Sequence, residues 1–156
     1  MSNTKTRFSV GVMTRIAILT AIASILFLIE IPVVAFYKLD LSNMPVLLGT
    51  FSMGAVPGLI ILFLKSAIGL LHSSSAGVGE LADFIMGAAL ILPAALIYHR
   101  NKTRKSAIIG MLIGTLVMTV FGSAFNAIYL LPKFAALYGM PMEAIIGMYQ
   151  AINPKV

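Results

Sequence analysis

Apolar residues form five long runs in this chain, and short polar stretches separate the runs. A transmembrane α-helix needs about 20 largely apolar residues to cross a hydrocarbon core of about 30 Å. The first, fourth and fifth runs are long enough by this measure. We therefore expect an all-α integral membrane protein with five spans, at 12–36, 44–56, 58–71, 78–99 and 106–131.

The second and third runs are each shorter than a full span, and Pro57-Gly58 between them is typical of a turn. These two segments can tilt, continue into neighbouring residues or form a re-entrant hairpin. Residues 1–11 read as a polar lead-in. Residues 132–156 are expected to return as an outer loop with a short amphipathic helix at 142–152, so the chain 1–156 forms one membrane domain.

Composition supports the membrane assignment. The 156 residues are 60% hydrophobic and 10% charged, with a mean hydropathy of +1.01, whereas soluble domains are nearer half apolar and a quarter charged. The chain has no cysteine, which excludes a thiol nucleophile and a cysteine-ligated metal.

The placement of basic residues predicts the orientation in the membrane. Two clusters of basic residues contain no acid. The first lies at the start of the first run and consists of Lys5, Arg7 and Arg15. The second lies between the fourth and fifth runs and consists of Arg100, Lys102, Arg104 and Lys105. Basic loops stay cytoplasmic, so both clusters and the N-terminus should lie inside. Beside apolar spans such a run is a topology signal, and no nucleic-acid partner is expected.

Two carboxylates, Glu80 and Asp83, open the fourth run, and their spacing of three places them on one helix face. Ionisable groups inside a membrane usually face the bundle interior and mark a substrate or ion path. Lys65 in the third run has a stem long enough to bring its ammonium toward them. These residues predict an ion pair between helices, the polar floor of a pocket open to the outside, or both.

Asn126 in the fifth run has an amide that can read the hydrogen-bonding edge of a planar heterocycle. The same amide can instead form a hydrogen bond between helices. Tyr129, one helical turn closer to the outer surface, is expected to line the outer opening of the same predicted pocket. Ala17 and Ala21 in the first run are small residues four apart, which lets another helix approach closely, either within this bundle or in a partner.

Nothing in the pattern favours an enzyme. His72 lies at a helix end, and His99 is expected on the opposite membrane side, so no metal site is predicted. The glycines are spread through helices and form no phosphate-binding loop. No catalytic residue and no cofactor are therefore expected.

Four stretches of the chain are distinctive: LDLSNMP at 39–45, GVGELADF at 77–84, KTRK at 102–105, and GTLVMTV at 114–120 followed by Asn126. Together they resemble the riboflavin-specific S components (the RibU family) of energy-coupling factor (ECF) vitamin transporters. The likeness extends from about residue 17 to residue 154. The GELAD and GTLVMT stretches are its more specific parts.

The resemblance implies a six-helix bundle in the bacterial cytoplasmic membrane that captures riboflavin from the outside, with the first outer loop over the pocket. It implies ligand contacts at Leu39, Asp40, Asn43, Glu80, Asp83, Gly122 and Asn126. It also implies that Ala17 and Ala21 dock a transmembrane coupling subunit, and that two ATPase subunits supply the energy. Riboflavin would be the transported ligand.

Two departures from the family pattern bear on binding. The family carries asparagine at the position of Asp83, which leaves the role of Asp83 in ligand recognition open. A sixth span is not found in 1–156, so either the sequence is a truncated piece of a longer chain or binding is incomplete. Three other interpretations remain open at this point. They are an S component for another vitamin, a small ion-coupled channel or carrier that uses Lys65, Glu80 and Asp83, and polar groups that only join helices.

Overall fold

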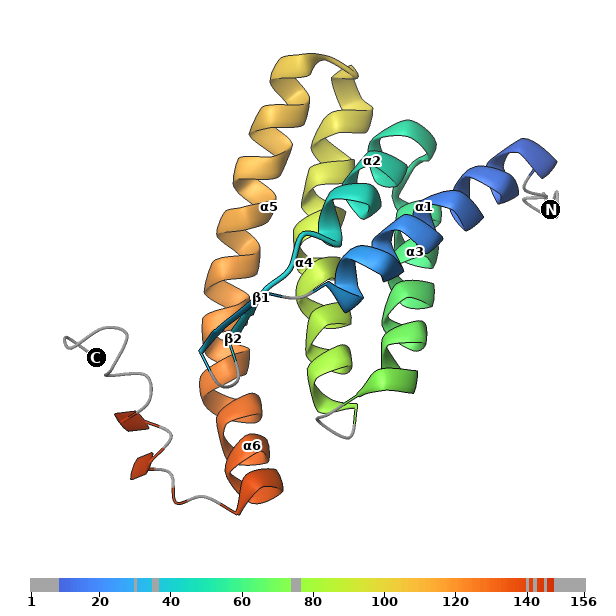
Figure 1. Ribbon diagram of the computed structural model, residues 1–156. Coiled ribbons are helices and arrows are strands. Elements are labelled where there is room, and N and C mark those ends of the chain that lie inside the picture. Colours follow the sequence, from blue (N-terminus) through green and yellow to red (C-terminus); the bar gives the residue numbers. More distant parts are fainter. Residues whose placement is uncertain are drawn as a thin grey trace, which may run out of the picture.

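The computed structural model describes residues 9–29, 31–34, 37–73, 77–139, 141, 143, 144, 146 and 147. Helices dominate, and α2 to α5 run in alternating directions, while α1 crosses them obliquely and α6 continues the line of α5 (Figure 1). The elements are α1 (Val10–Leu28), β1 (Ile31–Val34), β2 (Tyr37–Leu39), α2 (Asn43–Met53), α3 (Ala55–Gly69), η1 (Leu70–His72), α4 (Val78–Asn101), α5 (Arg104–Phe125), η2 (Asn126–Leu130) and α6 (Leu131–Tyr138).

The prediction of an all-α membrane bundle is confirmed, with one short two-stranded hairpin beside the helices. Five spans were predicted. Within the described residues, four helices are long and apolar enough to cross a bilayer: Val10–Leu28, Ala55–His72, Val78–Asn101 and Arg104–Lys133. The third run is therefore a full span, because η1 extends α3. The second predicted run forms α2, which has only 11 residues and packs against α1 and α3.

The first span ends earlier than its hydrophobicity predicted. The expected range of 12–36 was wrong at its outer end, since α1 stops at Leu28. The apolar residues that follow form β1, which pairs antiparallel with β2 in a short hairpin. Pro32 lies in β1, and a proline interrupts helical hydrogen bonding, which explains why apolar sequence here leaves the helix.

The turn between α2 and α3 lies at Gly54 and not at Pro57-Gly58, as the sequence had predicted. Gly54 has φ +114°, which an L side chain rarely adopts. Pro57 instead lies in the first turn of α3, where its missing N–H costs no helical hydrogen bond. Gly58 is needed for contact, because a Cβ there would collide with Thr50 of α2.

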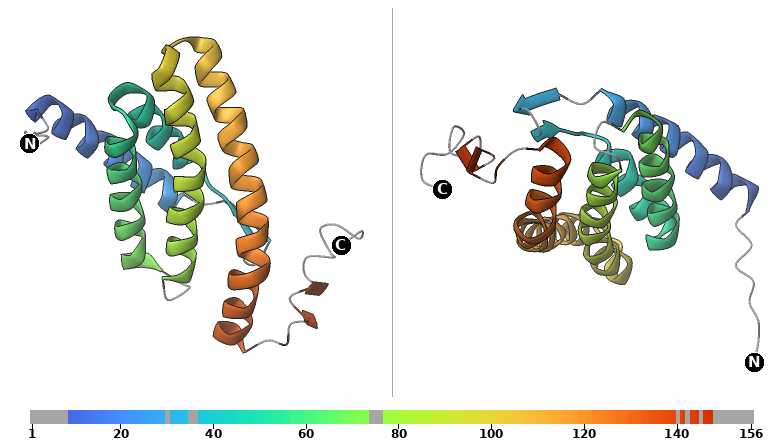
Figure 2. Two further views of the ribbon diagram at one scale, coloured as in Figure 1. Left: turned by 180° about the vertical axis from the view of Figure 1, so that it is seen from behind. Right: turned by 90° about the horizontal axis from the view of Figure 1, so that it is seen from below.

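Helices α4 and α5 are close at the end that carries their connecting turn and diverge toward the opposite end (Figures 1 and 2). Gly110 and Gly114 of α5 lie directly against the backbone of Ala94 and Leu90 in α4. Toward the opposite end, Gly122 faces a side chain instead, and a Cβ added to it would lie 3.2 Å from Sδ of Met86. Gly110 and Gly114 thus allow α4 and α5 to approach closely at one end. We call the arrangement of these two diverging helices the V, and its narrow end is the end near the α4–α5 turn.

The fifth helix continues further than predicted. The return loop expected from residue 132 is wrong, because η2 is a π-helical turn and α6 carries the helix on to Tyr138. Pro132 has no N–H to offer the preceding turn, and a π turn accommodates such a gap. The short helix expected at 142–152 lies mostly outside the described residues.

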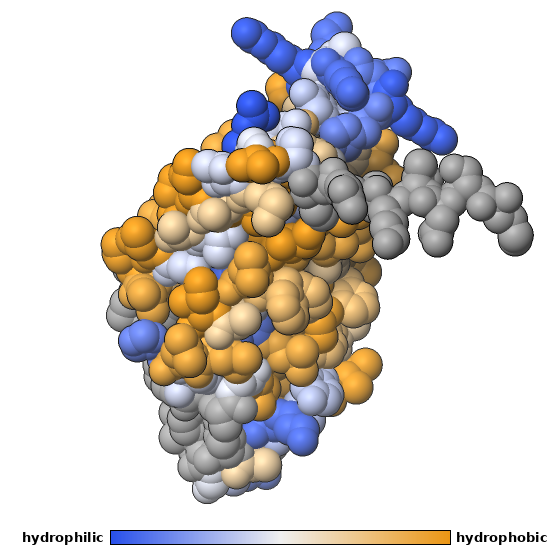
Figure 3. Space-filling model, turned by 90° about the vertical axis from the view of Figure 1, so that its right-hand side faces the viewer, coloured by the Kyte–Doolittle hydropathy of each residue, from blue (hydrophilic) through white to orange (hydrophobic). Residues whose placement is uncertain are grey.

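The surface fits a lipid environment. Large apolar side chains are exposed along all four long helices, and Figure 3 shows them covering a broad face, with hydrophilic side chains gathered at the end of the α4–α5 turn. The core is narrow and includes Ile61, Leu62 and Ile91, none of which is exposed. Leu62 packs where Gly87 of α4 leaves room.

Thr103 caps the start of α5, and this cap gives a first testable prediction. Its hydroxyl accepts a hydrogen bond from the backbone N–H of Ser106 at 3.1 Å. Thr103→Ala should lower the free energy of unfolding by about 1 kcal/mol, the usual effect of losing such a cap. Thermal unfolding in detergent, followed by circular dichroism, measures this; Thr103→Ser should retain most of the stability.

Candidate ligand-binding site

A buried lysine joins three parts of the chain. Lys65 of α3 is not exposed at all, and its Nζ lies 2.8 Å from Asp83 Oδ2 of α4. The same Nζ lies 2.7 Å from Ser42 Oγ and 3.2 Å from Asn43 Oδ1, at the start of α2. An ammonium has three protons to donate, and these three acceptors match them.

Asp40 completes this cluster from the segment between β2 and α2. Its Oδ2 lies 3.7 Å from Lys65 Nζ, and its two oxygens accept from the Ser42 backbone N–H and hydroxyl, both at 2.6 Å. Phe27 of α1 lies under the ammonium, 5.1 Å from its ring centroid. We call Asp40, Ser42, Asn43, Lys65 and Asp83 the Lys65 cluster.

Glu80 and Asp83 do not act as one pair, although both lie on α4. Glu80 is nearly buried and accepts a hydrogen bond from Ser73 Oγ at 2.9 Å, close to the α3–α4 connection. Ser73 Oγ in turn accepts from the Gly77 backbone N–H at 2.9 Å, where Gly77 has φ +86°. Asp83 turns instead to Lys65 and accepts from Ser66 Oγ at 3.2 Å.

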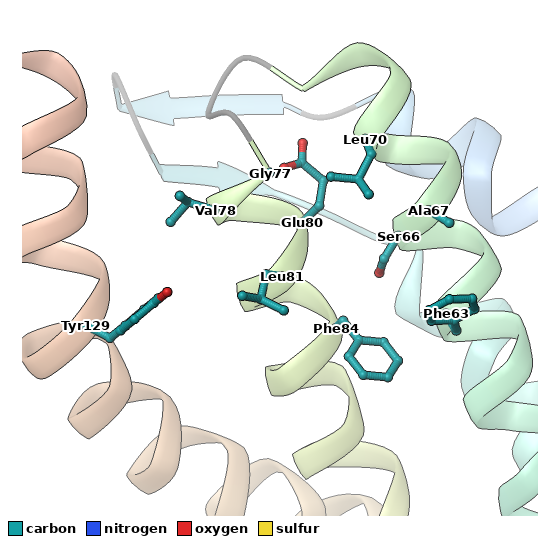
Figure 4. A pocket seen from close by; sticks show the side chains of 10 residues that line it. All are labelled: Phe63, Ser66, Ala67, Leu70, Gly77, Val78, Glu80, Leu81, Phe84 and Tyr129. Carbon is teal, nitrogen blue, oxygen red and sulfur yellow. The ribbon is translucent and has the colours of Figure 1, made fainter.

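A cavity of about 590 Å³ opens beside Glu80 (Figure 4). It lies between α3, the first turns of α4, and η2. Its lining is mainly apolar, with three aromatic rings and few polar groups: Phe63, Ser66, Ala67, Leu70, Gly77, Val78, Glu80, Leu81, Phe84 and Tyr129. Pockets of about 300–1,000 Å³ with apolar walls and few polar groups are typical of small-molecule sites.

Tyr129 reaches this cavity from the π-helical turn η2, on the far side from α3 (Figure 4). Its ring stacks on Phe125 with centroids 5.1 Å apart, and Phe125 stacks on Phe121 at 6.0 Å. Lys133 Nζ lies 5.9 Å from the Tyr129 centroid. Single π-helical turns are frequent at functional sites, where they redirect side chains.

Of the predicted ligand contacts, the structure places Glu80 and Tyr129 in the cavity lining. Asp40, Asn43 and Asp83 meet at the Lys65 cluster instead, which touches the cavity through Ser66. Gly122 packs on Met86, and Asn126 begins η2, three residues before Tyr129. Leu39 ends β2, and its side chain lies outside the described residues.

Sequence reasoning missed the apolar half of the lining. Phe63, Ser66, Ala67 and Leu70 recur at helical spacing on α3, so they share one face. That spacing carried no signal in the sequence, because apolar residues occupy every face of a membrane helix.

Ala17 and Ala21 are exposed, whereas the buried face of α1 is formed by other residues, namely Ile16, Thr20, Ala23 and Ser24. The small-residue pair therefore points away from this bundle.

A bundle with a lipid-facing surface and an apolar cavity walled by its helices is the arrangement typical of a membrane protein with a small-molecule site. Comparison with known proteins agrees. The profile of the family described as ECF transporter, substrate-specific component, matches residues 12–154. This chain belongs to that family, whose members are transporter components and not enzymes.

The relatives are bacterial. The riboflavin transporter RibU of Staphylococcus aureus is 40% identical over 128 residues, which are 80% of this chain and 68% of that protein. The riboflavin transporter FmnP of Bacillus subtilis is 29% identical over 76% of this chain and 66% of its own length. The chain thus spans about two thirds of these relatives.

A solved structure of the S component of a bacterial ECF transporter superposes with a TM-score of 0.74 at 35% identity. The superposition covers 88% of this chain and 83% of that one. The fold is therefore the S-component fold.

Proposed function

We propose that this chain is the substrate-binding subunit that captures riboflavin for uptake by an ECF transporter. The observation that carries the proposal is the 40% identity to a riboflavin transporter, over most of the chain. The cavity supports it, because riboflavin joins a flat, largely apolar ring system to a polyhydroxyl chain. The three aromatic residues suit the ring, and Glu80 and Ser66 suit the hydroxyl groups.

Within this proposal, Tyr129 and Phe84 contact the ring, and the Glu80 carboxylate accepts hydrogen bonds from hydroxyl groups of the chain. Glu80 lies beside the α3–α4 connection, so the polar chain of the ligand points toward that connection. Leu39, Asp40, Asn43, Asp83, Gly122 and Asn126 stay predicted contacts. They would need a ligand that extends beyond the described cavity or a rearrangement of the segment before α2.

Transport in this proposal needs partners. A transmembrane coupling subunit would dock on the exposed Ala17 and Ala21 face of α1, where small residues allow close helix approach. Two ATPase subunits would supply the energy. The basic residues Arg100, Lys102, Arg104 and Lys105 favour a cytoplasmic α4–α5 turn, which places the N-terminus inside and the cavity toward the outer surface of a bacterial cytoplasmic membrane.

A titration of riboflavin into the detergent-purified protein tests the function. Flavin fluorescence should be quenched with a saturable, one-site curve, because the ring enters an aromatic cavity. Thiamine, biotin and folate should neither compete nor bind. Quenching that does not saturate, or equal competition by another vitamin, would remove the riboflavin assignment.

Tyr129→Ala gives the sharpest test of the cavity as the binding site. Stacking of a flat heterocycle on an aromatic side chain contributes about 1–3 kcal/mol, so the Kd for riboflavin should rise by about 5- to 150-fold. Tyr129→Phe should stay close to the parent. Phe121→Ala is the matched control, because Phe121 belongs to the same aromatic stack but does not line the cavity. Equal effects of Tyr129→Ala and Phe121→Ala would place the ligand elsewhere.

A further inference from the structure

One ammonium serves two carboxylates that belong to different parts of the fold. Asp83 is on α4, which walls the cavity, whereas Asp40 is on the segment that joins the β-hairpin to α2. Lys65 Nζ donates to Asp83 at 2.8 Å and lies 3.7 Å from Asp40. The contact with Asp40 is therefore the longer of the two, and the Ser42 hydroxyl mediates it by hydrogen bonding to both Lys65 and Asp40.

The charges around Lys65 are unequal. One buried cation faces two carboxylates whose side chains are only 17% and 16% exposed, so one negative charge is left over when both are ionised. Like charges that share one site repel each other, and low surrounding polarity strengthens the repulsion. Asp83 thus acts on Asp40 in two ways, since it takes part of the Lys65 attraction and also repels Asp40 directly.

We propose that Lys65 is a positioning residue that holds the Asp40–Asn43 segment against α3 and α4, and that Asp83 competes with Asp40 for Lys65. This competition sets how readily the segment lifts. Three of the contacts of Lys65 are made to the segment: Asp40, Ser42 and Asn43. The segment connects the hairpin to α2, so its release would free both to move.

The competition also bears on the ligand, and in this respect the inference rests on the proposed function. Ser66 lines the cavity and donates to Asp83, so the cavity wall and the Lys65 cluster share a hydrogen bond. A segment that is held more firmly keeps α3 and α4 in their cavity-forming positions for longer. Riboflavin should therefore leave more slowly when Asp83 no longer competes.

Asp83→Asn is the decisive variant, because it removes a charge but keeps the size of the side chain and an oxygen that accepts from Lys65. The chain has no cysteine, so Leu41→Cys introduces a single site for a spin label on the segment, at a residue that is 48% exposed. Asp83→Asn should broaden the label's electron paramagnetic resonance spectrum, which means lower mobility. Asp40→Asn should narrow the spectrum, which means higher mobility.

These opposite signs separate competition from simple bracing. If Asp83 only braced the cluster, Asp83→Asn and Asp40→Asn would both raise label mobility, and that result would overturn the proposal. Unchanged mobility in both variants would overturn it too. Lys133→Met is the control, because Lys133 is an exposed lysine on α6 that contacts Tyr129 and should leave the label at position 41 unaffected.

The dissociation rate of riboflavin gives the second measurement, by stopped-flow fluorescence on the same proteins without the label. Asp83→Asn should slow dissociation by about 1.5- to fivefold, the scale of a partly exposed ion pair. Faster dissociation would overturn the link to the ligand. If the parent protein binds no riboflavin, the proposed function fails, while the label mobilities still decide the competition for Lys65.

Discussion

Replacing Lys65 by methionine is expected to lower the free energy of unfolding by about 3–5 kcal/mol, the usual effect of removing one partner of a buried ion pair. Methionine keeps much of the length and the apolar stem but removes the ammonium. Asp83 and Asp40 would then face each other without a cation, and Ser42 and Asn43 would lose a donor. Chemical unfolding in detergent micelles, followed by circular dichroism, measures the loss.

Two further variants show whether charge is the cause. Lys133→Met removes an exposed lysine and should change stability by less than about 0.5 kcal/mol, as surface substitutions usually do. Adding Asp83→Asn to Lys65→Met removes one of the stranded charges, so the double variant should recover part of the lost stability. A Lys65→Met protein as stable as Lys133→Met would show that the cluster does not hold the bundle together.

Gly114→Val should separate α4 from α5 and is the second large effect. A Cβ at residue 114 would collide with the carbonyl oxygen of Leu90. Backbone atoms cannot rotate aside as a side chain can, so the helices must move apart. The expected loss of stability is at or above the upper end of the about 1–3 kcal/mol found for overpacked cores.

The same substitution should weaken riboflavin binding, because Tyr129 lies on the continuation of α5 and would shift with it. Gly11→Val is the matched control, since the nearest atom to a Cβ there is 4.0 Å away. Both variants are compared by unfolding in detergent and by flavin quenching. Equal stability of the two would mean that glycine is not what allows α4 and α5 to approach.

The α4–α5 packing and the Lys65 cluster stand at opposite ends of the site. Gly110 and Gly114 fix the narrow end of the V, and the cavity occupies the wide end, between Tyr129 and α3. The cluster then ties the segment before α2 to that wide end. The glycine contacts are steric and do not respond to salt. The Lys65 ammonium is fully buried, and salt screens buried charges much less than exposed ones. High salt should therefore disturb neither set of contacts greatly.

Hydrophobic run length was enough to predict the membrane class and the extent of the fourth span, 78–99 against an observed Val78–Asn101. This works because a bilayer imposes one length on any helix that crosses it. Run length was misleading where backbone chemistry intervenes. Pro32 leads apolar residues into a strand, and Gly54 makes the turn that Pro57-Gly58 had been expected to make.

The resemblance carried by GELAD and GTLVMT indicated the family, because both stretches are specific. In the structure these two stretches belong to α4 and α5. Glu80 and Tyr129, which line the cavity, were also singled out from the sequence, since a charge and a polar ring are conspicuous in apolar surroundings; their contact with a ligand stays a prediction. Phe63, Phe84 and Leu81 could not be found in that way. In a membrane helix they look like any lipid-facing residue.

The chain's residues therefore specify which segments lie in the membrane, which charges must be neutralised there and which family it belongs to. They do not specify which group neutralises which. Glu80 and Asp83 are one helical turn apart, yet one bonds Ser73 and the other Lys65. That choice depends on which helices are neighbours and how far α5 leans from α4. Both are properties of packing in three dimensions, and neither can be predicted from the linear pattern of apolar residues.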